Sequence, residues 1–208
     1  MRTIWILGAG GLAREIAWLA QTTGLFEVRG FIDRNAGAAI TMNGTELPVV
    51  AETDLPGLPL QDELALGTGD PALRHALGMR YRDQRIFPNL FHPSVCGDHA
   101  GSEIGTGNLF TANVVFTTSI RIGHFNLFNL ATTIGHDCII GDANVINPSA
   151  NISGAVIIGD RVLIGTNATV LQGRSIGHDV TVGAASLVNK DVEEGLTVVG
   201  VPAKPLVR

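Results

Sequence analysis

The sequence predicts two units, an α/β domain over residues 1–85 and a parallel β-helix over residues 86–208. Two observations lead to this prediction. A strand, a glycine turn, a helix and a second strand follow one another at the start of the chain, which is the order of a nucleotide-binding α/β unit. Further along, a large apolar residue recurs at every sixth position, which indicates a stack of short strands.

The first unit begins with the apolar run TIWIL at residues 3–7, followed by a glycine cluster and LAREIAWLAQTTG. Leu12, Ile16 and Leu19 have helical spacing, and Gly24 ends the predicted helix. The segment FEVRGFID is the predicted second strand, with Asp33 at its end. This order would place the glycine turn at a helix N-terminus, where backbone N–H groups bind phosphate.

The glycine turn departs from the full dinucleotide fingerprint. Gly8, Gly10 and Gly11 are present, but Ala13 stands where the third glycine would fall. A plain tight turn without a ligand is therefore the alternative to a phosphate site. Residues 41–60 are predicted to be irregular, and ELALGTGDPALRHAL then predicts a third strand, a turn and a helix that begins at Asp70–Pro71.

The second half has a six-residue repeat that no helix explains, because six residues advance an α-helix by about 600° and would spread the apolar side chains around it. A triangular solenoid explains it, with one short strand and one corner per hexad and three hexads per coil. Fifteen hexads give five coils, and their apolar residues are Ile104, Phe110, Phe116, Ile122, Phe128, Ile134, Ile140, Ile146, Ile152, Ile158, Ile164, Val170, Ile176, Val182 and Val188.

Composition excludes several classes of protein. The net charge is −5 and no run of Lys or Arg occurs, so a nucleic-acid partner is not expected. No apolar run approaches the roughly 20 residues of a membrane span, and Arg14–Glu15 interrupts the faintly signal-like start, so neither membrane insertion nor a targeting segment is expected. Cys96 and Cys138 are predicted to be free thiols of a cytoplasmic protein, with Cys138 in the solenoid core.

Residues 104–193 resemble the left-handed β-helix hexapeptide acyltransferases. The whole chain resembles the subgroup with a Rossmann-like domain before the helix, which contains the sialic-acid O-acetyltransferases and the N-acetyltransferases of nucleotide-linked 4-amino sugars. The resemblance is carried by ILGAGGLAREIAWLA, GFID, TTIGHDCIIGD, ISGAVIIGDRVLIGTNATV and VVGVPAKP. It implies acetyl-CoA as co-substrate, no metal, and a homotrimer with its active site between neighbouring β-helices.

Three histidines occupy the same place within their hexads. His124 and His178 are 54 residues apart, a multiple of 18, and share one face, whereas His136 lies on another. Corner histidines without a chemical role are the simpler interpretation of His124 and His178. For His136 the surrounding GHD segment resembles the family's catalytic segment, and a neutral imidazole suits the removal of a proton from an amine. Asp137 would orient the ring or else be an exposed turn carboxylate.

The 18-residue period places Gly154 one coil after His136. The resemblance implies that its amide binds the acetyl carbonyl oxygen. It also implies the residues that bind the rest of CoA and the nucleotide sugar. The expected CoA-binding residues are Gly154, Thr166, Ala184, Gly200, Ala203 and Lys204, although Lys204 is equally well explained as a solvated tail residue. The expected substrate-binding residues are Gly8, Gly10, Gly11, Asp33 and Arg34.

The chain departs from the family pattern at three places. Val145 stands where bacillosamine-type enzymes carry a second His, and Asn147 is a candidate replacement for its hydrogen bond. Leu12 stands where many relatives have His after the glycine pair. Arg34 stands where relatives that bind the nucleotide base often have a second acid. The base bound by this chain is therefore open, and a base other than uracil is compatible with the sequence.

The function predicted on these grounds is acetyl transfer from acetyl-CoA to the amino group of a nucleotide-linked 4-amino sugar, for bacterial surface glycan synthesis. Sialic-acid-type O-acetylation is the alternative within the family. A non-catalytic trimeric scaffold that binds nucleotide sugars is a second alternative. Zinc-dependent carbonic anhydrases share the solenoid, but they require converging histidines, and His124 and His136 fall on different faces.

Overall fold

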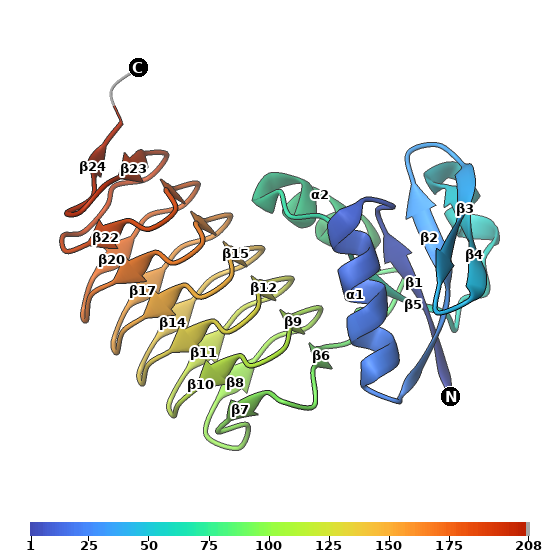
Figure 1. The fold of residues 1–208 in the computed structure, drawn as a ribbon, viewed down its shortest axis with the longest axis horizontal. Helices are drawn as coiled ribbons and strands as arrows, with labels where there is room; N and C mark the ends of the chain where they lie inside the picture. The colour runs from blue at the N-terminus through green and yellow to red at the C-terminus, as the bar shows by residue number, and fades with distance from the viewer. Residues whose placement is uncertain (207–208) are drawn as a thin grey trace.

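The computed structural model describes residues 1–206 and contains an α/β unit beside a long solenoid (Figure 1). A five-stranded sheet with the order β3-β4-β2-β1-β5 forms the α/β unit, and all neighbouring strands are parallel except β3 and β4. Its elements are β1 (Arg2–Leu7), α1 (Gly11–Thr22), β2 (Phe26–Asp33), β3 (Gly37–Met42), β4 (Thr45–Ala51), the 3₁₀ helix η1 (Glu52–Gly57), β5 (Glu63–Leu66) and α2 (Pro71–Tyr81). The predicted Rossmann-like order is confirmed.

The prediction of an irregular segment over residues 41–60 is wrong. Strands β3 and β4 form an antiparallel hairpin there, and its turn consists of Asn43 and Gly44 with φ angles of 49° and 79°. An Asn-Gly pair favours this two-residue turn because both positions need positive φ. The prolines of the segment obscured that signal.

The second unit consists of three parallel sheets built from two-residue strands, and we name them by their members. Sheet I contains β7 (Cys96–Gly97), β10 (Val115–Phe116), β13 (Thr133–Ile134), β16 (Asn151–Ile152), β19 (Thr169–Val170) and β22 (Leu187–Val188). Sheet II contains β8 (Glu103–Ile104), β11 (Arg121–Ile122), β14 (Ile139–Ile140), β17 (Ile157–Ile158) and β20 (Ser175–Ile176). Sheet III contains β6 (Leu90–Phe91), β9 (Leu109–Phe110), β12 (Leu127–Phe128), β15 (Val145–Ile146), β18 (Leu163–Ile164), β21 (Thr181–Val182), β23 (Thr197–Val199) and the antiparallel β24 (Lys204–Pro205).

The predicted period of three hexads per coil is confirmed by the strand register. Thr133 pairs with Asn151 and Ile139 with Ile157, so each residue lies beside its counterpart 18 positions later. The solenoid begins earlier than the hexad count from Ile104 indicates, because Leu90 already pairs with Leu109. Seven residues instead of six separate Cys96 from Glu103, and this extra residue hides the first coil from a strict count of six.

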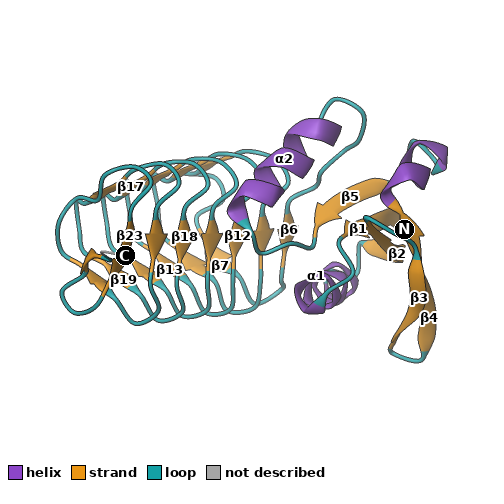
Figure 2. Cartoon of the chain, turned by 90° about the horizontal axis from the view of Figure 1, so that it is seen from above, coloured by secondary structure: helices purple, strands orange, loops and turns teal. Residues whose placement is uncertain are grey.

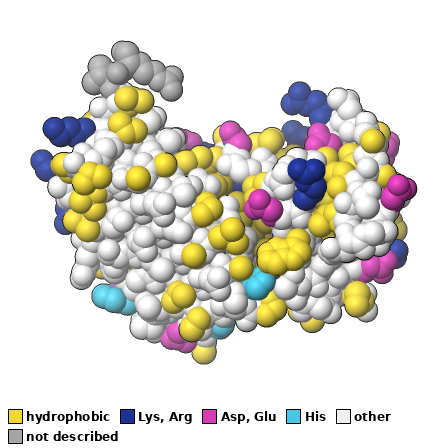
Figure 3. Space-filling view, in the orientation of Figure 1, with side chains coloured by type: hydrophobic (Ala, Val, Ile, Leu, Met, Phe, Trp, Pro, Cys, Tyr) yellow, Lys and Arg dark blue, Asp and Glu magenta, His cyan; other side chains and the backbone are white. Residues whose placement is uncertain are grey.

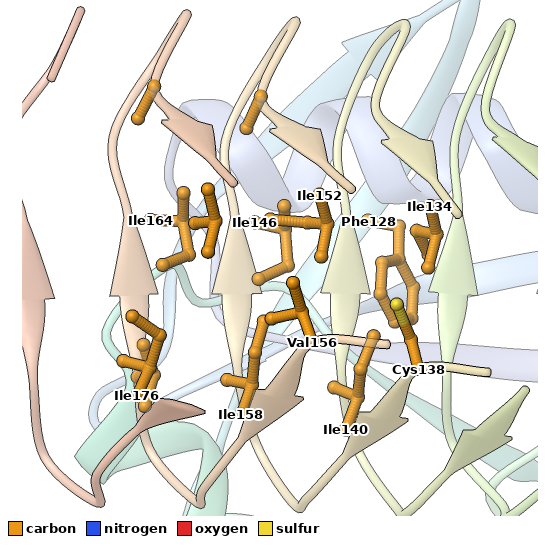
Figure 4. Packing of buried hydrophobic residues seen from close by; sticks show 14 of the residues in the cluster. Phe128, Ile134, Cys138, Ile140, Ile146, Ile152, Val156, Ile158, Ile164 and Ile176 are labelled. Carbon is orange, nitrogen blue, oxygen red and sulfur yellow. The ribbon is translucent and has the colours of Figure 1, made fainter. Parts of the chain in front are cut away.

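The apolar hexad positions fill the interior of the triangle as predicted. Ile146 and Ile164 are fully buried and lie in one column, while Ile140 and Ile158 form another (Figure 4). Cys138 is a free, fully buried thiol in this core, and Cys96 is free and exposed. Each coil buries its own apolar layer, so the solenoid needs no other unit to cover its interior.

The α/β unit packs against sheet III and one corner of the solenoid (Figure 2). Helix α1 shares a buried apolar cluster with the outward side chains Leu109, Leu127 and Val145 of sheet III. Helix α2 packs against Phe125, whose ring lies 2.7 Å from the position that a Cβ on Gly78 would take. This contact leaves sheets I and II as the faces of the solenoid that the α/β unit does not cover.

Candidate active site

The solenoid has three rows of turns, and each row joins two sheets. Corner I–II joins sheets I and II and contains His136 and Gly154. Corner II–III contains His124 and His178, and corner III–I contains Thr166 and Ala184. The sequence prediction that His136 lies on a different face from His124 and His178 is therefore confirmed.

His136, Asp137 and Gly154 form one compact group at corner I–II. The Nδ1 atom of His136 lies 2.7 Å from Oδ2 of Asp137. Gly154 lies against the other side of the ring, where a Cβ would approach Nε2 to 2.6 Å. A carboxylate at Nδ1 favours the tautomer with its proton on that nitrogen. Nε2 is then the ring nitrogen that keeps a lone pair, and half of the His136 side chain is exposed.

The local sequence explains why this group forms. Gly135 is required because a Cβ there would lie 2.5 Å from the amide nitrogen of Gly154 in the next coil. Asp137 has a φ of 60°, the left-handed conformation that asparagine and aspartate adopt more readily than most residues. The amide of Ala155 donates to the carbonyl of His136 at 2.7 Å, which fixes the two coils in register.

The turn amides are satisfied differently at the two corners that carry histidine. At corner II–III the amide of His124 donates to Asp142 Oδ1 at 2.7 Å, and the amide of Asp160 donates to His178 Nδ1 at 2.9 Å. Among residues 1–206 the corresponding amide of Gly154 has no such acceptor. This contrast agrees with a structural role for His124 and His178, and it leaves a hydrogen-bond donor available beside His136.

Of the six predicted CoA-binding residues, only Gly154 lies beside His136 in the same chain. Thr166 and Ala184 are exposed at corner III–I, on the opposite edge of sheet I from His136. The tail joins them there, because the amide of Gly200 donates to Ser186 Oγ and the amide of Ala203 donates to the carbonyl of Leu187. Within one chain, sheet I therefore lies between Gly154 at corner I–II and the other predicted CoA-binding residues at corner III–I. Lys204 follows them in β24 and is exposed.

The predicted substrate-binding residues surround one cleft of about 570 Å³ in the α/β unit. The cleft lies at the carboxyl ends of β1, β2 and β5, the edge of an open α/β sheet where ligands bind. Asp33 orders its floor, since Oδ2 accepts from the amide of Ala9 at 2.9 Å and Oδ1 from the amide of Arg34 at 2.7 Å. Gly8 adopts a φ of 110°, which favours glycine, and Gly10, Gly11 and Arg34 line the same cleft.

One wall of this cleft, the loop Gly67–Gly69, was not predicted from the sequence. Its signal was present, because the loop follows a strand and precedes the Asp70 cap, whose Oδ1 accepts from the amide of Leu73 at 2.8 Å. Leu12 also lines the cleft, at the place where many relatives have His. Val145 lies elsewhere, buried between sheet III and the α/β unit, and Asn147 is half-buried at corner III–I.

The surface gives no sign of a metal centre or a membrane segment in the described part of the chain. Within residues 1–206, no three His, Cys, Asp or Glu side chains are grouped so that they could hold a metal ion. None of the helices in that range combines the length and apolarity that crossing a membrane requires. On the face seen in Figure 3, the solenoid carries few charged side chains and several exposed hydrophobic ones.

Comparisons with known proteins agree with both halves of this description. Residues 3–80 match the family described as the PglD N-terminal domain, and residues 155–190 match the hexapeptide repeat of succinyl-transferase. Comparison with curated proteins gives no match.

Solved structures resemble the chain over nearly its whole length. A histidine-to-asparagine mutant of perosamine N-acetyltransferase from Caulobacter crescentus, in complex with CoA and GDP-perosamine, is 30% identical, with 99% of this chain and 97% of that chain covered and a TM-score of 0.92. The acetyltransferase domain of PglB from Neisseria gonorrhoeae, in complex with acetyl coenzyme A, is 31% identical, with 99% of each chain covered and a TM-score of 0.91. WeeI from Acinetobacter baumannii is 28% identical, with 98% and 99% covered and a TM-score of 0.85.

Fold and site together define an acyltransferase built on a left-handed parallel β-helix with a Rossmann-like domain before it. The chain belongs to the hexapeptide-repeat acetyltransferase family that contains the N-acetyltransferases of nucleotide-linked amino sugars. The family and enzyme class predicted from sequence are thereby confirmed.

Proposed function

We propose that this protein transfers an acetyl group from acetyl-CoA to the amino group of a nucleotide-linked 4-amino sugar. The observation that carries the proposal is the group at corner I–II, in which Asp137 lies at Nδ1 of His136 and Gly154 packs against the Nε2 end of the same ring. The cleft of the α/β unit provides a separate place for a nucleotide. Relatives in complex with GDP-perosamine and with acetyl coenzyme A support the same pair of substrates.

The chemistry follows from the positions of these groups. His136 Nε2 accepts a proton from the sugar amine as its nitrogen attacks the thioester carbonyl carbon. The oxygen of that carbonyl becomes an oxyanion, and the Gly154 amide donates to it; one such donor contributes about 3 kcal/mol in other enzymes. The C–S bond then breaks, and the imidazolium returns its proton to the CoA thiolate. Asp137 stabilises the charged imidazolium between these two steps.

The same proposal includes a homotrimer, because the predicted site is divided between two corners. Sheet I faces outward with no charged side chain among Cys96, Val115, Thr133, Asn151, Thr169 and Leu187. If three copies direct sheet I toward a common axis, corner I–II of one copy lies beside corner III–I of the next. Such an arrangement is closed, as most homo-oligomers are. His136 would then act on CoA held partly by the neighbour's Thr166 and Ala184.

The enzyme is placed in the cytoplasm by this proposal, where acetyl-CoA and nucleotide sugars are made and where two free thiols persist. Bacterial surface glycan synthesis is the process that consumes such acetylated nucleotide sugars. O-acetylation of a sialic-acid-type hydroxyl is the competing activity within the family.

The experiment is a thiol-release assay with acetyl-CoA and 4-amino sugars linked to UDP, GDP or dTDP. We expect CoA release with at least one of them, and mass spectrometry of the product should find the acetyl group on nitrogen. Release only with hydroxyl acceptors would replace the proposal with O-acetylation. Absence of release with every acceptor, together with unaltered ligand binding in His136→Asn, would favour a non-catalytic scaffold.

The trimer has its own test, by complementation between two inactive variants. His136→Asn removes the base at corner I–II, and Ala184→Trp blocks the exposed CoA surface at corner III–I. Each variant alone should be inactive. Unfolding and refolding the two together should restore part of the activity, because mixed trimers contain sites with both corners intact. A mixture that stays inactive while forming mixed trimers would show that each site lies within one chain.

A further inference from the structure

Helix α2, which lies over the solenoid beside the α/β unit (Figure 2), carries the fully buried Arg74. Arg74 Nε donates to the carbonyl of Phe125 at 2.9 Å, and Nη1 donates to the carbonyls of Leu66 at 3.1 Å and Thr68 at 2.8 Å. Its Nη2 atom has no partner among the described residues. Burial lowers the pKa of Arg74 to about 9, so the guanidinium remains charged at neutral pH.

Stability alone does not explain such a group. A buried charge costs free energy unless it is fully hydrogen-bonded, and apolar residues of similar size are often equally stable in its place. Arg74 also has one unsatisfied nitrogen. Its three acceptors, however, are all backbone carbonyls of segments whose relative position affects the cleft.

The bonds of Arg74 determine which way the loop Gly67–Gly69 presents its amides. A trans peptide directs its C=O and the following N–H in opposite directions. The carbonyl of Leu66 points to Arg74, and the amide of Gly67 accordingly points away and donates to Leu7 at 2.7 Å. The carbonyl of Thr68 also points to Arg74, so the amide of Gly69 points away from it as well.

The Gly69 amide therefore lies on the cleft side of the loop. Gly69 lines the cleft, whereas Arg74 does not. A Cβ on Gly69 would lie 3.3 Å from Leu12, which stands in the first turn of α1 across the cleft. Among residues 1–206 the Gly69 amide has no acceptor. The amides of the α1 N-terminus and of this loop thus face the same space from two sides.

We infer that Arg74 is a positioning residue for the nucleotide sugar: it holds the loop Gly67–Gly69 so that the Gly69 amide donates to the diphosphate of the bound nucleotide. Through Phe125 it also ties this loop to corner II–III of the solenoid. The inference rests on the proposed nucleotide-linked substrate. Its ligand chemistry is that of a nucleoside diphosphate, and acetyl-CoA is not expected to depend on Arg74.

Arg85 provides a matched control. It is also a buried arginine of the α/β unit, and its guanidinium donates to the carbonyls of Leu55, Leu58 and Pro59. None of these three residues lines the cleft. Removing either arginine leaves three backbone carbonyls without their donor, so both losses should lower the melting temperature.

The experiment measures binding of UDP, GDP and dTDP by calorimetry to the wild type, Arg74→Met, Arg74→Lys and Arg85→Met. We expect Arg74→Met to lower the affinity for the nucleotide that the wild type binds by at least about 10-fold. This is the usual effect of losing a hydrogen bond to a charged group. Acetyl-CoA affinity should be unchanged. Arg74→Lys, which keeps the charge and one donor direction, should recover part of the affinity and replaces Arg74→Met if that variant does not fold.

Three results would overturn the inference. One is nucleotide affinity in the folded Arg74 variants equal to that of the wild type. Another is an equal loss in Arg85→Met, because the effect would then follow from lowered stability. The third is absence of binding of all three diphosphates to the wild type. Because these measurements need no acetyl transfer, a failure of the inference is distinguishable from a failure of the proposed reaction.

Discussion

Gly154 and the imidazole of His136 are in direct contact across one coil of the solenoid. A Cβ at position 154 would lie 2.6 Å from Nε2 and 2.7 Å from Cε1 of that ring. Only glycine permits this approach, and the contact places Gly154, whose amide has no acceptor among residues 1–206, at the Nε2 end of the ring. The spacing of 18 residues between them is the period of the solenoid itself.

Gly154→Ala should therefore displace the His136 ring without altering any ionisable group. Because a misplacement of about 1 Å can reduce a rate by about 100-fold, we expect kcat to fall about 10- to 100-fold. Steady-state kinetics at saturating acetyl-CoA measures this effect. Gly57→Ala is the control, since a Cβ there meets no atom within 4 Å. Equal kcat values for Gly154→Ala and the wild type would mean that the ring position is not catalytic.

His136→Asn should lower kcat at least about 100-fold, because general base catalysis contributes about 10²–10⁴. Acetyl-CoA affinity should stay near that of the wild type, since the loss concerns the transition state and not the ground state. Asp137→Asn should have a smaller effect of the same kind, because the 2.7 Å contact orients the ring without itself reacting. A wild-type kcat in His136→Asn would remove this residue from the mechanism.

The solenoid could be predicted in detail because its coils repeat in the sequence with a fixed period of six residues per strand. Each hexad places one aliphatic residue inward, so the coils, the buried Cys138 and the neighbouring positions of His136 and Gly154 all follow from counting. The count failed at both ends: at the first coil, where the seven-residue step after Cys96 breaks the period, and at the last, where Thr181 pairs with Thr197 only 16 residues later.

Other features depend on contacts between residues that belong to no repeat, and these could not be predicted by counting. The junction of Arg74 with Phe125 joins residues 51 positions apart and lacks any repeating pattern. The separation of Thr166 from His136 by sheet I became visible only once the hexads were assigned to three sheets. The β3–β4 hairpin was not predicted because Pro48 lies inside β4, and proline is uncommon within a strand.

Val145 occupies the place of the second histidine of some relatives, but in this structure it is a core residue between the two units. It is 2% exposed and packs in the apolar cluster that joins sheet III to the α/β unit. Val145→His would bury an imidazole there without a polar partner, at a cost of about 1–3 kcal/mol. We therefore expect a lower melting temperature and no gain in kcat. Thr181→His, a half-buried outward position on the same sheet, is the control. A rise in kcat for Val145→His would place this position in the active site.

A ladder of buried asparagines stabilises the solenoid where corner II–III enters sheet III. Asn126 Oδ1 accepts from the amide of Asn144 at 2.8 Å, and its Nδ2 donates to Asn108 Oδ1 at 3.0 Å and to the carbonyl of Gly141 at 2.9 Å. Asn126 has no exposed surface. These bonds join three successive coils through one side chain.

Asn126→Ala should therefore destabilise the protein far more than loss of a surface asparagine. The change leaves the buried amide of Asn144 and the carbonyl of the half-buried Gly141 without partners, at about 1–3 kcal/mol for each group, so we expect a total of about 2–6 kcal/mol. Urea unfolding at one fixed protomer concentration measures this difference, since assembly would make stability depend on concentration. The exposed Asn189→Ala is the control and should change the free energy of unfolding by less than about 0.5 kcal/mol. Similar unfolding midpoints for the two variants would show that the coils are held by their apolar interior alone and that the ladder contributes nothing measurable.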